Sequence, residues 1–104
     1  CKVGIADSYL KRLVGLLGHR KLGKGEGLLL TGCKQIHTFG MKFRIDAIFL
    51  SDDGRILHID ENMKANKISK NVKDAHMVLE LEAGTISRYE IKVQNTVGFK
   101  RVGR

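Results

Sequence analysis

The stretch FRIDAIFLSDDGRILHIDE, residues 43–61, decides the fold class of this chain. If residues 43–50 are extended, successive side chains point to opposite faces of the chain. This period of two is typical of a β-strand with one face toward a core. The turn-forming letters SDDG at 51–54 separate this run from RILHIDE at 55–61, which is expected to form the returning strand. Two strands joined by a short turn that contains glycine predict a β-hairpin over residues 43–61.

Short runs of the same kind occur on both sides of the hairpin. Residues 2–6 and 77–82 alternate, residues 28–30 are apolar, and residues 91–102 offer one or two closing strands around a turn at Asn95. Strands at this close spacing, in a chain of 104 residues, predict one mainly β domain that spans the whole chain. The expected architecture is a small β-sandwich or a barrel-like fold.

One α-helix is expected in the N-terminal half of the chain. Within DSYLKRLVGLLG, residues 7–18, four apolar side chains have the i, i+3, i+4, i+7 spacing of one helix face: Leu10, Leu13, Val14 and Leu17. Asp7 or Ser8 could cap its first turn, and Gly18 could end it. A single helical turn is also expected in TISRYE, residues 85–90.

The charge of the chain favours anionic partners. The formal net charge is +8, with 19 Lys and Arg against 11 Asp and Glu. Such a surface attracts nucleic acid, anionic lipid, and phosphorylated or carboxylated ligands. The basic residues gather in a glycine-rich loop at 18–27 and in an exposed segment at 64–74, so nucleic-acid or surface-polyanion binding through the basic loop and Lys64–Lys73 is one hypothesis. Nucleic acid has weak support, because aromatic residues make up only 6% of the chain and no single-strand stacking motif is present.

The sequence gives no support for several well-known sites, although a metal site assembled by the tertiary structure stays open. Gly18, Gly23 and Lys24 match most of a phosphate-binding loop, but position 25 is Gly and lacks the hydroxyl that would bind Mg²⁺. The four histidines are scattered and no C-x-x-C or H-x-x-x-H pair exists, so neither a metal nor another cofactor is expected. No apolar run reaches the ~18 residues of a membrane-spanning helix.

Cysteine chemistry supports a second hypothesis, a hydrolase-type enzyme. Cys33 and His37 are four residues apart, and Asp46 lies on the neighbouring strand, so a nucleophile, a base and an orienting carboxylate occur close together. As a structural alternative, Cys33 is a small core residue and His37 fixes a corner of the chain.

Cys1 and Cys33 could also pair. The strand-like residues directly after Cys1 argue against a lipid-modified cysteine.

Two carboxylates are expected in partly apolar surroundings, where an unpaired charge is costly. Asp46 is therefore expected to pair with a backbone N–H, with Thr38, or with an arginine such as Arg12 or Arg20. Glu80 poses the same problem. Either carboxylate could act as a general acid or base, although a structural ion pair is the commoner arrangement.

The leading hypothesis is a non-catalytic domain that binds a small anionic or polar ligand. Its polar lining is expected to come from Arg12, Arg20, His37, Thr38 and Asp46. If the protein is instead an enzyme, the candidate catalytic residues are Cys33, His37, Asp46 and Glu80.

The chain resembles an uncharacterised prokaryotic family, domain of unknown function 192. The resemblance rests on RLVGLLGHRKL, GLLL, CKQIHTFGMKFRIDAIFL, DDGRILHI and VLELEAGTISR, in this order. Its most specific part is the pattern I-H-T-x-G-M, then I-D-x-x-F-L, then L-E-x-x-x-G. The positions that recur in the family are Arg12, Gly15, Leu16, Arg20, His37, Thr38, Met41, Asp46, Phe49, Gly54, Glu80 and Gly84.

The resemblance implies a compact, mostly β, sandwich-like domain with little helix and no established activity. It also implies that Arg12, His37, Asp46 and Glu80 meet in space. Some relatives carry export signals, so the location is open between the cytoplasm and an extracytoplasmic compartment. The chain departs from the pattern at Gln94 and Asn95, where many relatives have Gly-Asp, which leaves the geometry of the last turn open.

Overall fold

The predicted hairpin is present in the fold. In the computed structural model, β5 (Ile45–Leu50) and β6 (Ile56–Met63) pair antiparallel around the turn at 51–54. The structure describes residues 9–11, 13–17, 20–22, 27–39 and 42–101. The strand predicted at residues 2–6 lies outside these residues.

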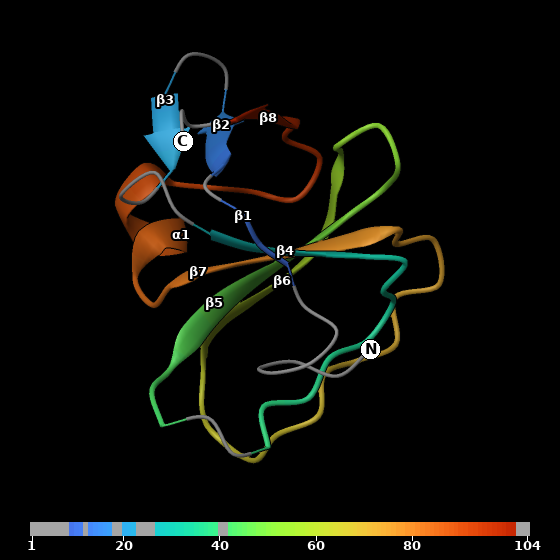
Figure 1. The fold of residues 1–104 in the computed structure, drawn as a ribbon, viewed down its shortest axis with the longest axis vertical. Coiled ribbons are helices and arrows are strands. Elements are labelled where there is room, and N and C mark those ends of the chain that lie inside the picture. Colours follow the sequence, from blue (N-terminus) through green and yellow to red (C-terminus); the bar gives the residue numbers. More distant parts are fainter. Residues whose placement is uncertain (1–8, 12, 18–19, 23–26, 40–41, 102–104) are drawn as a thin grey trace.

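The described strands form two antiparallel sheets, which Figure 1 shows one above the other. The larger sheet has the order β1-β4-β7-β5-β6, and the smaller one has the order β3-β2-β8. The bounds of the larger sheet's other strands are Tyr9–Lys11 for β1, Gly27–Thr31 for β4 and Met77–Glu82 for β7. Those of the smaller sheet are Leu13–Leu17 for β2, Arg20–Leu22 for β3 and Val97–Arg101 for β8. Because β1 and β6 remain edge strands, the larger sheet does not close into a barrel.

Strand β5 carries the core because it is buried along its whole length. A strand covered on both faces needs apolar residues on both, which explains its nearly continuous apolar run. On one face, Ala47 and Phe49 pack with Cys33 and Val72 from the connecting segments. On the other face, Ile48 and Leu50 pack with residues that include Ile86, Ile91 and Val97.

The prediction of an α-helix in the N-terminal half is wrong. Residues 9–11 and 13–17 are strands, and the helix of the described chain is α1, Thr85–Tyr89, in the C-terminal half. The helical turn expected at 85–90 is therefore confirmed. Strand β2 pairs along its full length with β8, and the glycine at position 15 is a weak helix former. Pairing with strands far away in the sequence outweighs the local helical spacing of the leucines, since helical stability in proteins comes mainly from packing.

Two connecting segments run side by side below the larger sheet in Figure 1, and we call them the paired loops. They comprise residues 34–39 and 42–44 on one side and residues 64–73 on the other. Backbone hydrogen bonds join residues 34–38 to residues 66–72: the Val72 N–H donates to the Lys34 carbonyl at 2.7 Å and the Ser69 N–H donates to the Ile36 carbonyl at 2.8 Å. The exposed excursion predicted at 64–74 is thus attached to the other segment on one side.

Candidate functional site

Asp46 is fully buried on β5, and its two carboxylate oxygens accept three hydrogen bonds from backbone N–H groups. Its Oδ1 accepts a hydrogen bond from the Asn62 N–H at 2.8 Å, and its Oδ2 accepts from the N–H groups of Gly84 at 3.0 Å and Ile86 at 2.8 Å. The register of β5 against β6 shifts beside Asp46, which turns the Asn62 N–H toward it. Of the partners expected from the sequence, backbone N–H groups are the ones observed. Asp46 therefore holds together a bulge and a helix start.

Thr38 is equally committed to structure. Its Oγ1 donates to the Lys64 carbonyl at 2.7 Å and accepts from the Lys67 N–H at 3.0 Å. Its own N–H donates to the Lys67 carbonyl at 2.9 Å, and its carbonyl accepts from the Asn66 N–H at 3.0 Å. The buried Thr38 thereby fastens one paired loop to the other.

His37 precedes Thr38 and lies next to the hydrogen bonds that join the paired loops. Its backbone forms an isolated β-bridge with Ile68, and its ring lies 4.7 Å from the Phe39 ring, centroid to centroid. The buried Nδ1 of His37 has no hydrogen-bond partner within the described structure. The ring thus contacts Phe39 while its Nδ1 lacks a partner among the described residues.

Cys33 is completely buried, and its sulfur is held in a disulfide. A thiolate is the form of cysteine that attacks substrates, so this bond leaves no nucleophile at position 33 while it is closed.

The four residues that the resemblance brings together do not all meet. Asp46 is directly opposite Leu81 in the register of β5 against β7, and Ala47 is opposite Glu80. Since neighbouring residues of a strand point to opposite faces, Asp46 and Glu80 lie on opposite sides of the sheet. Arg12 lies outside the described residues. Arg20 belongs to β3, and its side chain is not among those described.

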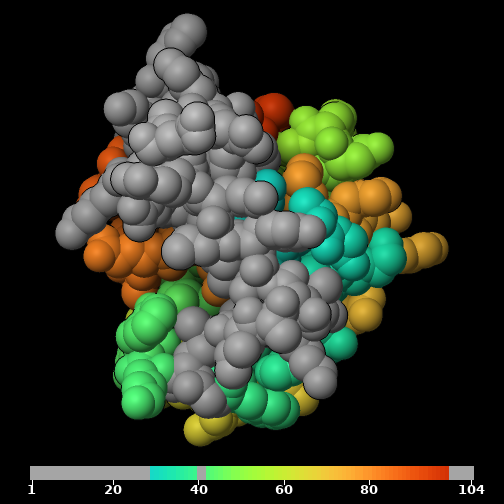
Figure 2. All heavy atoms as spheres, viewed as in Figure 1, coloured from blue at the N-terminus to red at the C-terminus, as the bar shows by residue number. Residues whose placement is uncertain are grey.

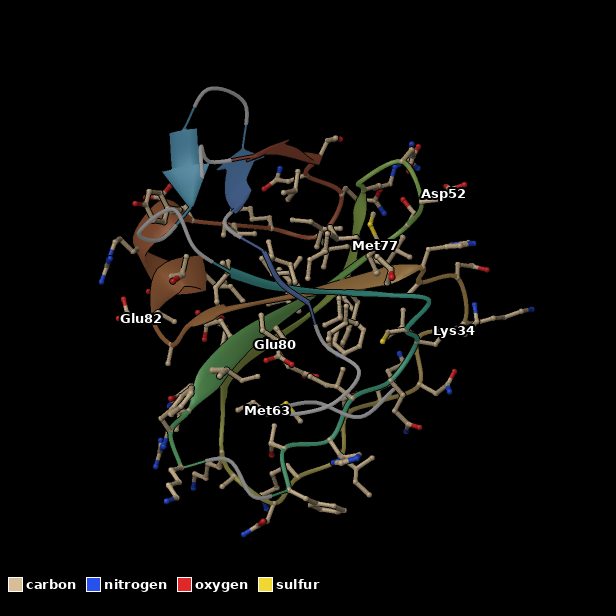
Figure 3. The ribbon with its side chains drawn as sticks, in the orientation of Figure 1. Lys34, Asp52, Met63, Met77, Glu80 and Glu82 are labelled. Carbon is tan, nitrogen blue, oxygen red and sulfur yellow. The ribbon has the colours of Figure 1, made fainter. Side chains whose placement is uncertain are left out.

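Glu80 forms a polar position in the middle of the sheet (Figure 3). It is 5% exposed, and its Oε2 has no hydrogen-bond partner in the described part of the protein. Burial raises the pKa of Glu80 from 4.5 to about 7, because an ionised carboxylate loses its hydration there. Glu80 is therefore the described carboxylate whose environment comes closest to that of a general acid or base.

Asp60 shares the sheet face of Glu80 but was missed by the sequence reasoning. Ala47 is opposite Glu80 on one side and opposite Asp60 on the other, so the small alanine separates the two carboxylates. Asp60 Oδ1 lies 3.2 Å from His58 Nε2, while its buried Oδ2 has no partner among the described residues. The alternation of His58 and Asp60 in β6 was the available signal. Within the described ranges, no group of His, Cys, Asp and Glu is arranged to hold a metal ion.

The paired loops present an unbalanced positive charge. Neither segment contains Asp or Glu. Seven basic side chains of these loops are exposed: Lys34, Lys42, Arg44, Lys64, Lys67, Lys70 and Lys73. In the space-filling view of Figure 2, residues of both segments form the lower end of the molecule. Because these segments contain no acidic residue, every charge that they themselves contribute is positive.

The same loops expose large apolar side chains. Phe39 is 50% exposed, Phe43 is 67% exposed and Ile68 is 63% exposed. The other large apolar side chain that is comparably exposed within the described ranges, Val93 at 45%, lies in the turn before β8. Basic and apolar groups therefore share one end of the molecule.

Comparison with known proteins identifies the family of this chain. The family DUF192, described as an uncharacterised ACR family, matches residues 1–99. The chain belongs to the DUF192 family. A crystal structure of a protein of unknown function from Novosphingobium aromaticivorans DSM 12444 has a similar fold, with a TM-score of 0.65 and 23% sequence identity over 81% of this chain. The match covers 64% of that protein, so the DUF192 chain spans less than two thirds of its length.

Membership of DUF192 assigns no activity, and the neighbouring structure carries none in its description. The search of curated proteins gave no match. Over the described parts of the DUF192 chain, no helix has both the length and the apolarity needed to cross a membrane.

Proposed function

We propose that this DUF192 domain is a non-catalytic module that binds an anionic partner through the paired loops. The observation that carries the proposal is the set of seven exposed basic side chains in two segments without a single acidic residue. The proposal keeps the anionic ligand class expected from the sequence. It moves the binding surface away from Thr38 and Asp46, because the polar atoms of both side chains are occupied by backbone groups.

The hydrogen bonds between the loops support this role. They fix the backbone at positions 34, 36, 38 and 67, so the backbones of the two segments that carry the basic side chains are held together at these points. Charges within about 8 Å of one another act jointly on an anion at physiological ionic strength. His37 and Thr38 then contribute by supporting the surface, without contacting the anion themselves.

The hydrolase alternative retains one supporting observation, the Glu80 carboxyl with its pKa near 7. A group with such a pKa can exchange protons with a substrate at neutral pH. The alternative that uses Cys33 loses support because the sulfur is in a disulfide. The two functions are separable, since Glu80→Gln should leave anion binding by the paired loops unchanged.

The decisive experiment compares two sets of charge reversals in isothermal titrations with polyphosphate. The loop variant carries Lys64→Glu, Lys67→Glu and Lys70→Glu. The control carries Arg55→Glu, Arg88→Glu and Lys92→Glu, three exposed residues outside the loops that change the net charge equally. We expect the loop variant to lose roughly tenfold or more in affinity, and the control to lose much less, because local charge density decides the contact. Equal losses in both variants would show a general charge effect and refute the site.

A further inference from the structure

We propose that the anionic partner is the surface of a lipid bilayer, and that Phe39, Phe43 and Ile68 enter its interface. This inference rests on the proposed function and adds the class of partner. Its independent support is the exposure of three large apolar side chains on the basic loops: 50% for Phe39, 67% for Phe43 and 63% for Ile68.

Contacts with the rest of the paired loops hold Phe39 and Ile68 in place. Ile68 is bridged through its backbone to His37, whose ring lies against Phe39, so Ile68 and Phe39 flank one anchored residue. Thr38, between His37 and Phe39, ties this point to the carbonyl of Lys64 and the N–H of Lys67. The backbone that carries Phe39 and Ile68 is therefore already ordered, which favours binding by reducing its entropic cost.

The order of charges around the apolar groups fits a bilayer interface. Lys42 and Arg44 flank Phe43, and Lys67 precedes Ile68. Long basic side chains can lay their methylene stems along the acyl boundary while their charged ends reach lipid phosphates. Segments that bind membrane surfaces combine apolar insertion with attraction to anionic headgroups in this way.

A nucleic acid fits the same loops less well. Single strands bind through successive bases stacked on aromatic faces in a charged groove. Ile68 offers no such face, although it is among the most exposed apolar side chains of the loops. Strand β5 of the larger sheet is buried along its whole length, so it offers no open platform for stacking.

The test is sedimentation of the protein with vesicles of phosphatidylcholine alone and of phosphatidylcholine mixed with phosphatidylglycerol. We expect binding to the mixed vesicles only. The variant Phe43→Ala with Ile68→Ser should lose roughly tenfold or more in vesicle affinity while it binds polyphosphate as the wild type does. The matched control is Val93→Ser, an exposed apolar residue outside the loops, and it should bind vesicles like the wild type.

The outcomes separate the two proposals. Polyphosphate binding that depends on Lys64, Lys67 and Lys70, without binding to mixed vesicles or without an effect of the Phe43 and Ile68 substitutions, would overturn the lipid inference and leave the proposed function standing. Tighter binding to a single-stranded oligonucleotide than to mixed vesicles at equal salt would also overturn it. No dependence on the three lysines in any titration would overturn both. Circular dichroism on each variant confirms that it is folded.

Discussion

Asp46 on β5 accepts a hydrogen bond from the Ile86 N–H in the first turn of α1, at 2.8 Å, across a separation of forty residues. The same carboxylate oxygen accepts from Gly84, the N-terminal cap residue of that helix, which is in the left-handed conformation. A side chain of β5 thus supplies the capping that the helix lacks from its own cap residue.

Replacement of Asp46 by alanine should strongly destabilise the protein. It would leave three N–H groups without their acceptor, those of Asn62, Gly84 and Ile86. Each unsatisfied buried donor costs roughly 1–3 kcal/mol, so we expect a loss of about 3 kcal/mol or more in the free energy of unfolding. Asp46→Asn keeps one acceptor oxygen and should lose less. Urea unfolding followed by circular dichroism measures both.

Asp52→Asn is the matched control for Asp46. Asp52 lies exposed in the turn between β5 and β6, and its replacement should change the free energy of unfolding by less than about 0.5 kcal/mol. If Asp46→Ala were as stable as this control, the carboxylate would not be a structural element of the fold.

Glu80 should make stability depend on pH. The pKa of its carboxyl is about 7 in the folded protein against 4.5 ordinarily, so the folded state binds more protons between these values. The contribution of this carboxyl to the free energy of unfolding is therefore fully present below about pH 4.5. It declines as the pH rises to about 7, by up to roughly 3 kcal/mol. Glu80→Gln, which stays neutral, should gain stability relative to the wild type from about pH 5 to about pH 8.

Glu82→Gln tests whether this effect is specific to burial. Glu82 lies two residues further along β7 and is exposed. Its replacement should leave the pH profile of unfolding close to that of the wild type. A flat difference between Glu80→Gln and the wild type across this range would contradict the raised pKa.

Gly54 should resist substitution because two constraints act on it. Its φ is +87°, and a Cβ at this position would overlap the backbone carbonyl oxygen of Val97 in β8. We expect Gly54→Ala to reduce the free energy of unfolding by about 2 kcal/mol or more, from the left-handed backbone and the overlap together. Gly32→Ala has a similar φ of +69° without any neighbour within 4 Å, so it should cost only about 1 kcal/mol. Equal thermal shifts for both would exclude the contact with Val97 as the cause.

Thr38→Val should loosen the paired loops without unfolding the domain. Valine matches the shape of threonine but removes the hydroxyl that donates to the Lys64 carbonyl and accepts from the Lys67 N–H. We expect faster hydrogen exchange at the Lys67 amide, by tenfold or more, because about 1.4 kcal/mol of protection corresponds to that factor. Thr96→Val, at an exposed position next to β8, should leave this amide unchanged.

The local sequence pattern was sufficient to predict the hairpin and the apolar surroundings of Asp46 and Glu80. The alternation in residues 43–50 correctly separated Asp46 from Ala47, and the alternation in residues 77–82 correctly separated Glu80 from Leu81. Whether Asp46 and Glu80 share a side of the sheet depended on the register of β5 against β7, which neither segment encodes alone. Register arises from how distant strands bury their apolar faces against each other.

What the sequence by itself determined is the mainly β class, the hairpin, the short helix at Thr85–Tyr89 and the positive charge, because each follows from local periodicity or composition. Only the tertiary structure decided that residues 13–17 form a strand and that Asp46 caps a helix forty residues away. It also decided that two basic segments lie side by side. These features come from contacts between residues far apart in the chain, whose free energy exceeds the small local preferences that a sequence pattern displays.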